Sequence, residues 1–121
     1  MCVLITGGAG FIGQNLIRKL QQESMQEIII YDNFSLSNKN FLPSNVKTIE
    51  GSVEDKEKLL KSSKKVDTIV HLAAHTRVLE SIENPEKTFI SNIQGTFNIF
   101  ECCRLNKIKK LIIASTGGAI I

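Results

Sequence analysis

The chain contains few of the residue types that mark specialised proteins. Its 121 residues include no tryptophan, one tyrosine, two prolines and three cysteines. Cys2, Cys102 and Cys103 lack the spacing of a metal site or a disulfide framework, so we expect no metal and a reducing compartment. A formal net charge of +3 is too small to indicate a nucleic-acid partner.

Long hydrophobic runs are also absent, since no apolar run approaches the ~20 residues that span a membrane. The chain begins directly with a strand pattern, so we expect no signal peptide. We therefore expect a cytoplasmic protein without membrane association.

Short apolar runs alternate with amphipathic segments along the chain. The runs predict strands, the segments predict helices, and strands separated by helices pair in parallel through right-handed crossovers. We therefore expect one α/β domain spanning residues 1–121, a doubly wound parallel sheet with strand order 3-2-1-4-5. The expected strands are 2–6, 27–31, 46–50, 67–71 and 110–114, and the expected helices are 11–23, 54–63 and 86–106.

Two of these helices carry an apolar face at helical spacing. In the first helix it consists of Ile12, Leu16, Ile17 and Leu20. The long helix begins after Asn84-Pro85, and its face includes Phe89, Ile93, Phe97 and Phe100. Residues 33–45 are polar and predict a mobile surface loop. The hydrophobic end Ile120-Ile121 follows the last strand closely, so we expect a fold truncated after strand five.

A glycine cluster separates the first strand from the first helix. Gly7 permits a tight turn, Gly10 allows close approach of a ligand to the backbone, and Gly13 allows close packing of helix on strand. This order places backbone amides and the positive end of a helix dipole where a pyrophosphate can sit. A glycine-rich connector without a ligand is the alternative.

An acidic residue stands at the end of the second apolar run. Asp32, followed by Asn33, lies one helix and one strand beyond the glycines, where a carboxylate accepts hydrogen bonds from a ribose diol. The same charge would repel a 2′-phosphate, which favours NAD over NADP. The alternative is a turn, since Asp-Asn favours turns. Its coincidence with the glycine cluster favours the binding interpretation.

Six motifs in order make the chain resemble the extended short-chain dehydrogenase/reductase family, within it the NAD-dependent nucleotide-sugar epimerases and dehydratases. The resemblance implies a Rossmann-type sheet. The motifs are Thr6-Gly7-Gly8-Ala9-Gly10-Phe11-Ile12-Gly13, Tyr31-Asp32-Asn33, His71-Leu72-Ala73-Ala74, Ser81-Ile82-Glu83-Asn84-Pro85, Asn92-Ile93-Gln94-Gly95-Thr96-Phe97-Asn98 and Ser115-Thr116-Gly117-Gly118-Ala119.

The resemblance implies a set of cofactor-binding residues. Ser52 takes the place of an aspartate that contacts the adenine in many relatives, and Asn92 orders backbone or water near the cofactor. His71 is expected to be structural, whereas the role of His75 stays open. Arg77-Val78-Leu79 departs from the family's usual phrase, so the sugar is undetermined. The implied NAD-binding residues are Gly7, Gly10, Phe11, Ile12, Gly13, Asp32, Asn33, Ser52, Val53, Leu72, Ala73, Ala74 and Asn92.

The family's reaction transfers a hydride from a sugar carbon to NAD and, in an epimerase, returns it to the other face. A hydroxyl at the end of strand five contacts the sugar oxygen, and Thr116 is the first candidate, with Ser115 second. The family's Tyr-x-x-x-Lys pair does not occur in this sequence, whose only tyrosine is Tyr31. We therefore expect the NAD-binding half of a nucleotide-sugar epimerase, inactive by itself. The alternatives are a dehydratase of the same family and a non-catalytic NAD-binding module. The resemblance also implies a possible homodimer through the long helix.

Overall fold

Five strands form one sheet in the computed structural model, which describes residues 1–23 and 27–115. The strand order is β3-β2-β1-β4-β5 and every pairing is parallel, which confirms the expected topology. Residue Leu4 of the central strand lies opposite Ile29 on one side and Ile69 on the other. The strands are β1 Cys2–Thr6, β2 Glu27–Asp32, β3 Lys47–Glu50, β4 Thr68–His71 and β5 Lys110–Ile113.

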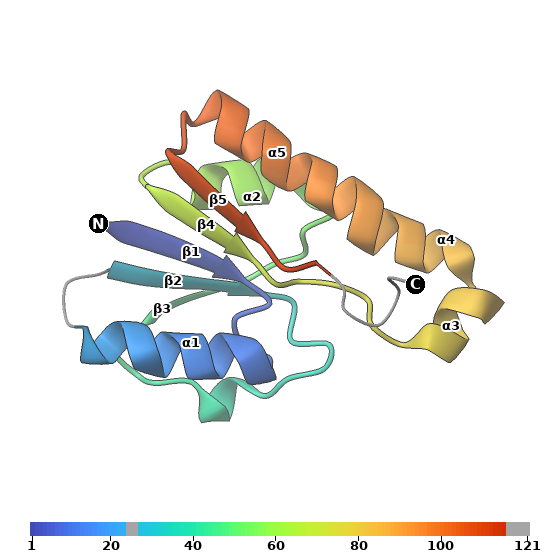
Figure 1. Ribbon diagram of the computed structural model, residues 1–121, viewed down its shortest axis with the longest axis horizontal. Coiled ribbons are helices and arrows are strands. Elements are labelled where there is room, and N and C mark those ends of the chain that lie inside the picture. Colours follow the sequence, from blue (N-terminus) through green and yellow to red (C-terminus); the bar gives the residue numbers. More distant parts are fainter. Residues whose placement is uncertain (24–26, 116–121) are drawn as a thin grey trace.

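Helices cover both faces of the sheet, so that the central strands are buried on both sides (Figure 1). Helix α1 (Phe11–Gln22) packs on one face, and α2 (Lys56–Ser62) and α5 (Gly95–Leu105) pack on the other. Successive side chains of β1 enter opposite cores, as the pleat of a strand requires. Leu4 packs with Ile69 and Ile99 beneath α5, whereas Ile5 packs with Ile17 of α1.

The single long helix expected over 86–106 is wrong in its details. The segment consists of α4 (Pro85–Thr88), a π-helical turn η2 (Phe89–Gln94) and α5. A further helix, α3 (Val78–Glu83), precedes it and was not expected. A regular 3.6-residue pattern cannot reveal a π-helical turn, which is an irregularity found often at functional sites. The predicted helix 54–63 begins slightly later, at Lys56 after the capping side chain of Asp55.

The expected apolar face of the long helix is also wrong, because it points outward. The four predicted side chains are each more than half exposed, at 53% for Phe89, 58% for Ile93, 53% for Phe97 and 51% for Phe100. The helix instead buries Gly95, Asn98, Ile99 and Cys102. The segment is apolar on two sides, and periodicity alone does not tell which of them meets the sheet. Ile12 of α1 is likewise exposed, whereas Ile17 of the same predicted face is buried.

The longest connection between two strands without an α-helix joins β2 to β3. The polar segment 33–45 contains a 3-10 turn, η1 (Lys39–Phe41), which is capped by the side chain of Asn38. The last described strand has exposed side chains at Ile112 and Ile113. Within the described ranges, none of the helices combines the length and the hydropathy that crossing a membrane requires.

Candidate functional site

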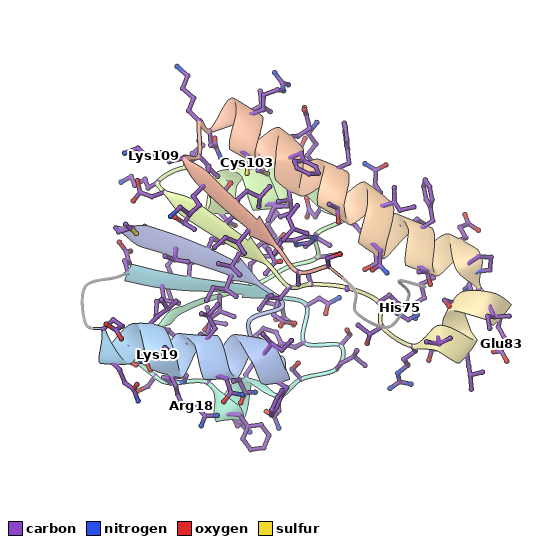
Figure 2. All side chains as sticks on the ribbon, in the orientation of Figure 1. Arg18, Lys19, His75, Glu83, Cys103 and Lys109 are labelled. Carbon is purple, nitrogen blue, oxygen red and sulfur yellow. The ribbon has the colours of Figure 1, made fainter. Side chains whose placement is uncertain are left out.

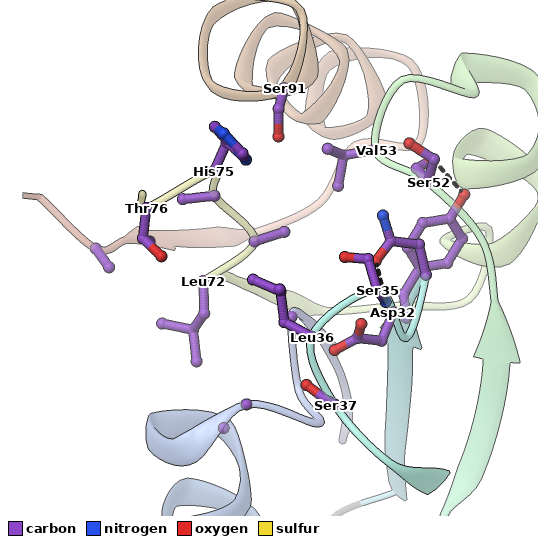
Figure 3. A pocket seen from close by; sticks show the side chains of 18 of the residues that line it. Asp32, Ser35, Leu36, Ser37, Ser52, Val53, Leu72, His75, Thr76 and Ser91 are labelled. Atoms are coloured by element: carbon purple, nitrogen blue, oxygen red, sulfur yellow. Dashed lines mark hydrogen bonds between the residues drawn. The ribbon is translucent and has the colours of Figure 1, made fainter. Parts of the chain in front are cut away.

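The loops that follow β1, β2, β3 and β4 meet at the carboxyl edge of the sheet and enclose a cavity of about 760 Å³ (Figure 3). The crevice outside the carboxyl ends of parallel strands is where open α/β sheets bind ligands. Twelve of the thirteen residues implied to bind the cofactor line this cavity: Gly7, Gly10, Phe11, Ile12, Gly13, Asp32, Asn33, Ser52, Val53, Leu72, Ala73 and Ala74.

Two glycines of the first loop, Gly7 and Gly13, occupy positions that a side chain would disturb. Gly7 has φ +66°, and a Cβ there would lie 2.8 Å from the backbone nitrogen of Ala73. A Cβ on Gly13 would lie 2.5 Å from the carbonyl oxygen of Gly8. At Gly10 the nearest atom would be 3.3 Å away. The loop is therefore shaped for close backbone approach, as the glycine spacing predicts.

The N-terminus of α1 opens into the cavity without a capping group. Gly10 is the N-cap residue, has no side chain to accept a hydrogen bond, and is followed by a first turn without an acidic residue. Within the described residues, the amides of Phe11, Ile12 and Gly13 have no acceptor. The first amide of the helix with an acceptor belongs to Gln14, whose nitrogen lies 2.9 Å from the carbonyl oxygen of Gly10. Free amides at the positive end of a helix dipole favour an anionic ligand such as a phosphate.

Asp32 connects the glycine loop to the next strand. Its Oδ2 accepts a hydrogen bond from the amide of Ala9 at 3.0 Å, and its Oδ1 accepts one from the amide of Phe34 at 2.9 Å. Only 8% of the residue is exposed, yet it lines the cavity. Because each carboxylate oxygen has two lone pairs, both retain the capacity to accept a hydrogen bond from a ligand hydroxyl.

Tyr31, the neighbour of Asp32, is buried and supports the loop after β3. Its hydroxyl donates a hydrogen bond to the carbonyl oxygen of Ser52 at 2.8 Å. Burial, with a smaller contribution from Asp55, raises the pKa of Tyr31 to about 12. The phenol therefore stays protonated near neutral pH, and its proton is held by a backbone oxygen. This geometry agrees with the expectation that Tyr31 does not transfer protons.

A buried hydrogen-bond chain holds the segment after β4. Oγ1 of Thr6 accepts hydrogen bonds from the amides of Leu72 at 3.2 Å and Ala73 at 3.3 Å, and lies 2.7 Å from Nδ1 of His71. Nε2 of His71 lies 3.1 Å from Oγ1 of Thr96, whose hydroxyl donates a hydrogen bond to the carbonyl oxygen of Asn92. Burial lowers the pKa of His71 to about 4. A neutral His71 with its proton on Nε2 satisfies every partner, so its role is structural, as expected.

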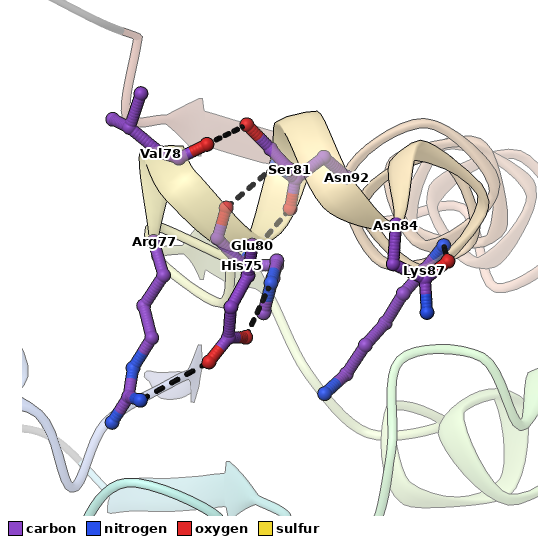
Figure 4. Close-up of polar contacts among 8 residues, drawn as sticks. All are labelled: His75, Arg77, Val78, Glu80, Ser81, Asn84, Lys87 and Asn92. Carbon is purple, nitrogen blue, oxygen red and sulfur yellow. Dashed lines mark hydrogen bonds and ion pairs between the residues drawn. The ribbon is translucent and has the colours of Figure 1, made fainter.

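His75 lies between the sheet edge and helix α3 (Figure 2). Its Nε2 is 3.1 Å from Oε2 of Glu80, whose other oxygen contacts Arg77 at 3.1 Å (Figure 4). Asn92 fixes the backbone of His75 from both sides, because its Oδ1 accepts from the amide at 2.6 Å and its Nδ2 donates to the carbonyl at 3.0 Å. Lys87 also lines the cavity, and in Figure 4 its side chain extends away from Asn84.

Of the remaining predicted site residues, Asn92 does not line the cavity itself. It binds the backbone of His75, which does line the cavity, and this contact fits the expected role of ordering backbone near the cofactor. Ser115 is exposed, and of the last described residues Ala114 lines the cavity while Ser115 does not. An extended strand end alternates the directions of its side chains, which places neighbours on opposite sides. Thr116 lies outside the described residues.

Several lining residues were missed by the sequence reasoning. Ser35, Leu36 and Ser37 belong to the segment after β2 that was expected to be a surface loop, and they lie beside Asp32 (Figure 3). Lys87 and Ser91 reach the cavity from the helical segment 85–94. No motif marks these residues, because their place at the cavity depends on the path of the chain in space.

Known proteins share this sequence pattern and this geometry. The model of the NAD dependent epimerase/dehydratase family matches residues 3–120. A UDP-glucose 4-epimerase of Thermus thermophilus, solved in complex with NAD, superposes with a TM-score of 0.93 at 34% identity, covering 99% of this chain and 39% of that one. The UDP-glucose 4-epimerase of Thermotoga maritima, solved with UDP-glucose, has a TM-score of 0.94 at 35% identity, covering 99% and 39%. A dTDP-D-glucose 4,6-dehydratase of Dictyostelium discoideum is 38% identical over 123 residues, which cover 94% of this chain and 28% of the relative. The chain thus spans less than two fifths of each of these proteins.

Proposed function

Because the chain belongs to the NAD dependent epimerase/dehydratase family, we propose that residues 1–121 form the NAD-binding domain of a nucleotide-sugar epimerase. The observation that carries this proposal is the open end of α1, where a glycine loop and three amides with no acceptor among the described residues face a cavity that Asp32 also lines. The residues fit the cofactor. The glycine loop is free of side chains where a pyrophosphate needs space, and a carboxylate stands one strand away where a ribose diol needs acceptors.

The two ends of NAD would lie on opposite sides of the glycine loop. Ser52 and Val53, after β3, would contact the adenine, with Asp32 and Asn33 holding its ribose. Leu72, Ala73 and Ala74, after β4, would contact the other ribose and the phosphates, and Asn92 would hold this side in place through His75. The carboxylate of Asp32 supports NAD over NADP, because a 2′-phosphate would meet a buried negative charge there.

The reaction itself needs groups that this sequence does not contain. When bound, NAD takes a hydride from a sugar carbon and returns it. Thr116, or Ser115, would supply the hydroxyl that contacts the sugar oxygen. The tyrosine and lysine that handle the sugar proton in the family's reaction are missing from this sequence, since Tyr31 is the only tyrosine and its hydroxyl donates a hydrogen bond to the carbonyl oxygen of Ser52. The 121-residue chain is therefore inactive by itself.

The substrate proposed for the whole protein is a nucleotide sugar. UDP-sugars are favoured because two of the similar structures are UDP-glucose 4-epimerases. A nucleotide-sugar dehydratase is the second candidate, supported by 38% identity to the Dictyostelium dTDP-D-glucose 4,6-dehydratase. A non-catalytic NAD-binding module is the third. An exposed apolar stripe on η2 and α5, formed by Phe89, Ile93, Phe97 and Phe100, supports a homodimer through this long helical segment. The three unpaired cysteines support a location in the cytoplasm.

Isothermal titration calorimetry of the 121-residue chain with NAD and with NADP tests this function. We expect NAD to bind and NADP to bind at least about tenfold more weakly, as one buried charge opposed to a phosphate would cause. An assay with NAD and UDP-glucose should give no epimerised sugar. Absence of NAD binding by the folded chain would refute the cofactor assignment, and epimerisation by the chain alone would refute its inactivity.

A further inference from the structure

Two buried polar side chains outside the proposed contacts reach the same loop. Tyr31 of β2 is 1% exposed and Asn98 of α5 is 2% exposed. Tyr31 donates a hydrogen bond to the backbone of Ser52, and Asn98 donates to the backbone of Val53 and Glu54, all in the segment that follows β3. Buried polar groups are costly unless they are paired, so a tyrosine and an asparagine aimed at one four-residue loop need an explanation.

Tyr31 holds the first half of this segment. Its hydroxyl donates to the carbonyl of Ser52 at 2.8 Å, and the amide of Asp55 donates to the same oxygen at 3.1 Å. The ring also packs directly against Gly51, where an added Cβ would lie 2.6 Å from the phenolic carbon. The Ser52 carbonyl is therefore turned into the protein and held there by two donors.

Asn98 holds the second half. Its Nδ2 donates to the carbonyl of Val53 at 2.8 Å and lies 3.3 Å from that of Glu54. Its Oδ1 accepts from Nε2 of Gln94 at 3.2 Å, which fixes the orientation of the amide. Helix α5 can approach this closely because a Cβ on Gly95 would lie only 2.6 Å from Cγ2 of Val53.

The direction of the carbonyls decides the direction of one amide. In a trans peptide the N–H points opposite to the C=O, so the N–H of Val53 points away from the carbonyl of Ser52 and hence from Tyr31. Among the described residues this N–H has no acceptor, although both Ser52 and Val53 line the cavity next to Asp32. A planar ligand with a hydrogen-bond acceptor on its ring edge would pair with the N–H of Val53.

We propose that Tyr31 and Asn98 are positioning residues which together hold segment 51–54 so that its free amide reads the purine ring of the cofactor. The proposal rests on the NAD-binding function above and adds the residues that set base recognition. Adenine presents a ring-nitrogen acceptor on the edge where hypoxanthine carries a hydrogen. An N–H held in place therefore favours adenine over hypoxanthine.

The test compares the affinity of the folded chain for NAD with its affinity for the analogue that carries hypoxanthine in place of adenine. Tyr31→Phe removes one hydroxyl, and Asn98→Leu removes the amide at similar volume. The matched control is Asn106→Leu, because Asn106 bonds to the carbonyl of Leu60 at 3.0 Å and to Oγ of Ser63 at 2.8 Å, away from the cavity. Thermal unfolding of each variant is recorded alongside.

We expect Tyr31→Phe to weaken NAD binding by about fivefold, as for one lost hydrogen bond, and to weaken binding of the analogue less, so that the preference for adenine falls. Asn106→Leu should lower the melting temperature and leave the preference unchanged. If Asn98→Leu does not fold, the base preference of Tyr31→Phe alone tests the positioning role. An unchanged preference in Tyr31→Phe, with NAD bound by the wild type, overturns the positioning role alone. A wild type that binds neither dinucleotide overturns the proposed function as well.

Discussion

Replacing Gly13 by alanine tests whether the close contact between α1 and the glycine loop determines the stability of this fold. On an exposed helix the change would stabilise the protein by up to about 1 kcal/mol, because alanine is the better helix former. Here the added Cβ would lie 2.5, 2.6 and 2.7 Å from the carbonyl oxygen, Cα and carbonyl carbon of Gly8. The gain in helix propensity and the steric cost therefore have opposite signs.

The steric cost should be larger. The three atoms in contact belong to the backbone, so no side chain can rotate aside, and carbon atoms prefer separations of about 3.5–4.0 Å. Relief requires α1 to move by roughly 1 Å, and overpacking of this kind costs about 1–3 kcal/mol. Taking the upper end, less the gain in propensity, we expect a net loss of about 2 kcal/mol, or about 8 °C in melting temperature for a domain of this size.

The assay is thermal and urea unfolding followed by circular dichroism, with Gly10→Ala as the control. Gly10 has φ −74° and ψ 177°, which any residue adopts, and its added Cβ would lie 3.3 Å from the nearest atom, the oxygen of Gly7. Gly10→Ala should change stability by less than about 1 kcal/mol yet weaken NAD binding at least about tenfold, because the methyl group would occupy the loop. A Gly13→Ala variant as stable as the wild type, or more stable, would refute the packing argument.

Three further predictions concern single side chains. The pKa of His71 is about 4 in the folded chain and about 6.5 when unfolded, so the unfolded state binds more protons between these two pH values. The free energy of unfolding should therefore fall by about 3 kcal/mol from pH 7 to pH 4. His71→Gln should remove this part of the pH dependence, measured by urea titrations at several pH values. A slope equal in both proteins would contradict the assignment. Asp32→Asn turns an NH₂ group toward one of two backbone amides, so it should lower the free energy of unfolding by about 1–2 kcal/mol and reduce the preference for NAD over NADP, measured by calorimetry. Phe97→Glu places a charge in the exposed apolar stripe, and light scattering should then show a monomer where the wild type is a dimer; an equal mass for both proteins would remove the proposed interface.

Much of the sheet was predictable because its signals are local. Runs such as Ile28-Ile29-Ile30 are buried on both faces, and burial on both faces demands a continuous apolar stretch that ends at polar or glycine residues. The same locality explains why Gly7, Gly13 and Asp32, which the sequence predicts to bind a ligand, line one cavity: each stands at the end of a strand or in the turn that follows it, and the carboxyl ends of parallel strands meet at one edge.

The helical segment 78–106 was less predictable, because its pattern supports more than one arrangement. Phe97 and Ile99 are both apolar and two residues apart, yet only Ile99 is buried. The two residue types do not indicate which side of the helix faces the sheet. The buried side is the one that carries Asn98, whose amide donates a hydrogen bond to the carbonyl of Val53, a partner 45 residues away in the chain.

The amino-acid sequence by itself determined the strand order, the glycine loop and the acidic residue beside it, because these depend on neighbouring residues and on the handedness of crossover connections. Only the tertiary structure decided which helix face is buried, that Asn92 bonds to the backbone of His75, and that Ser35 and Lys87 border the cavity. These features join residues distant in the chain, and their free energies arise from contacts that exist only once the sheet and both helical layers have packed together.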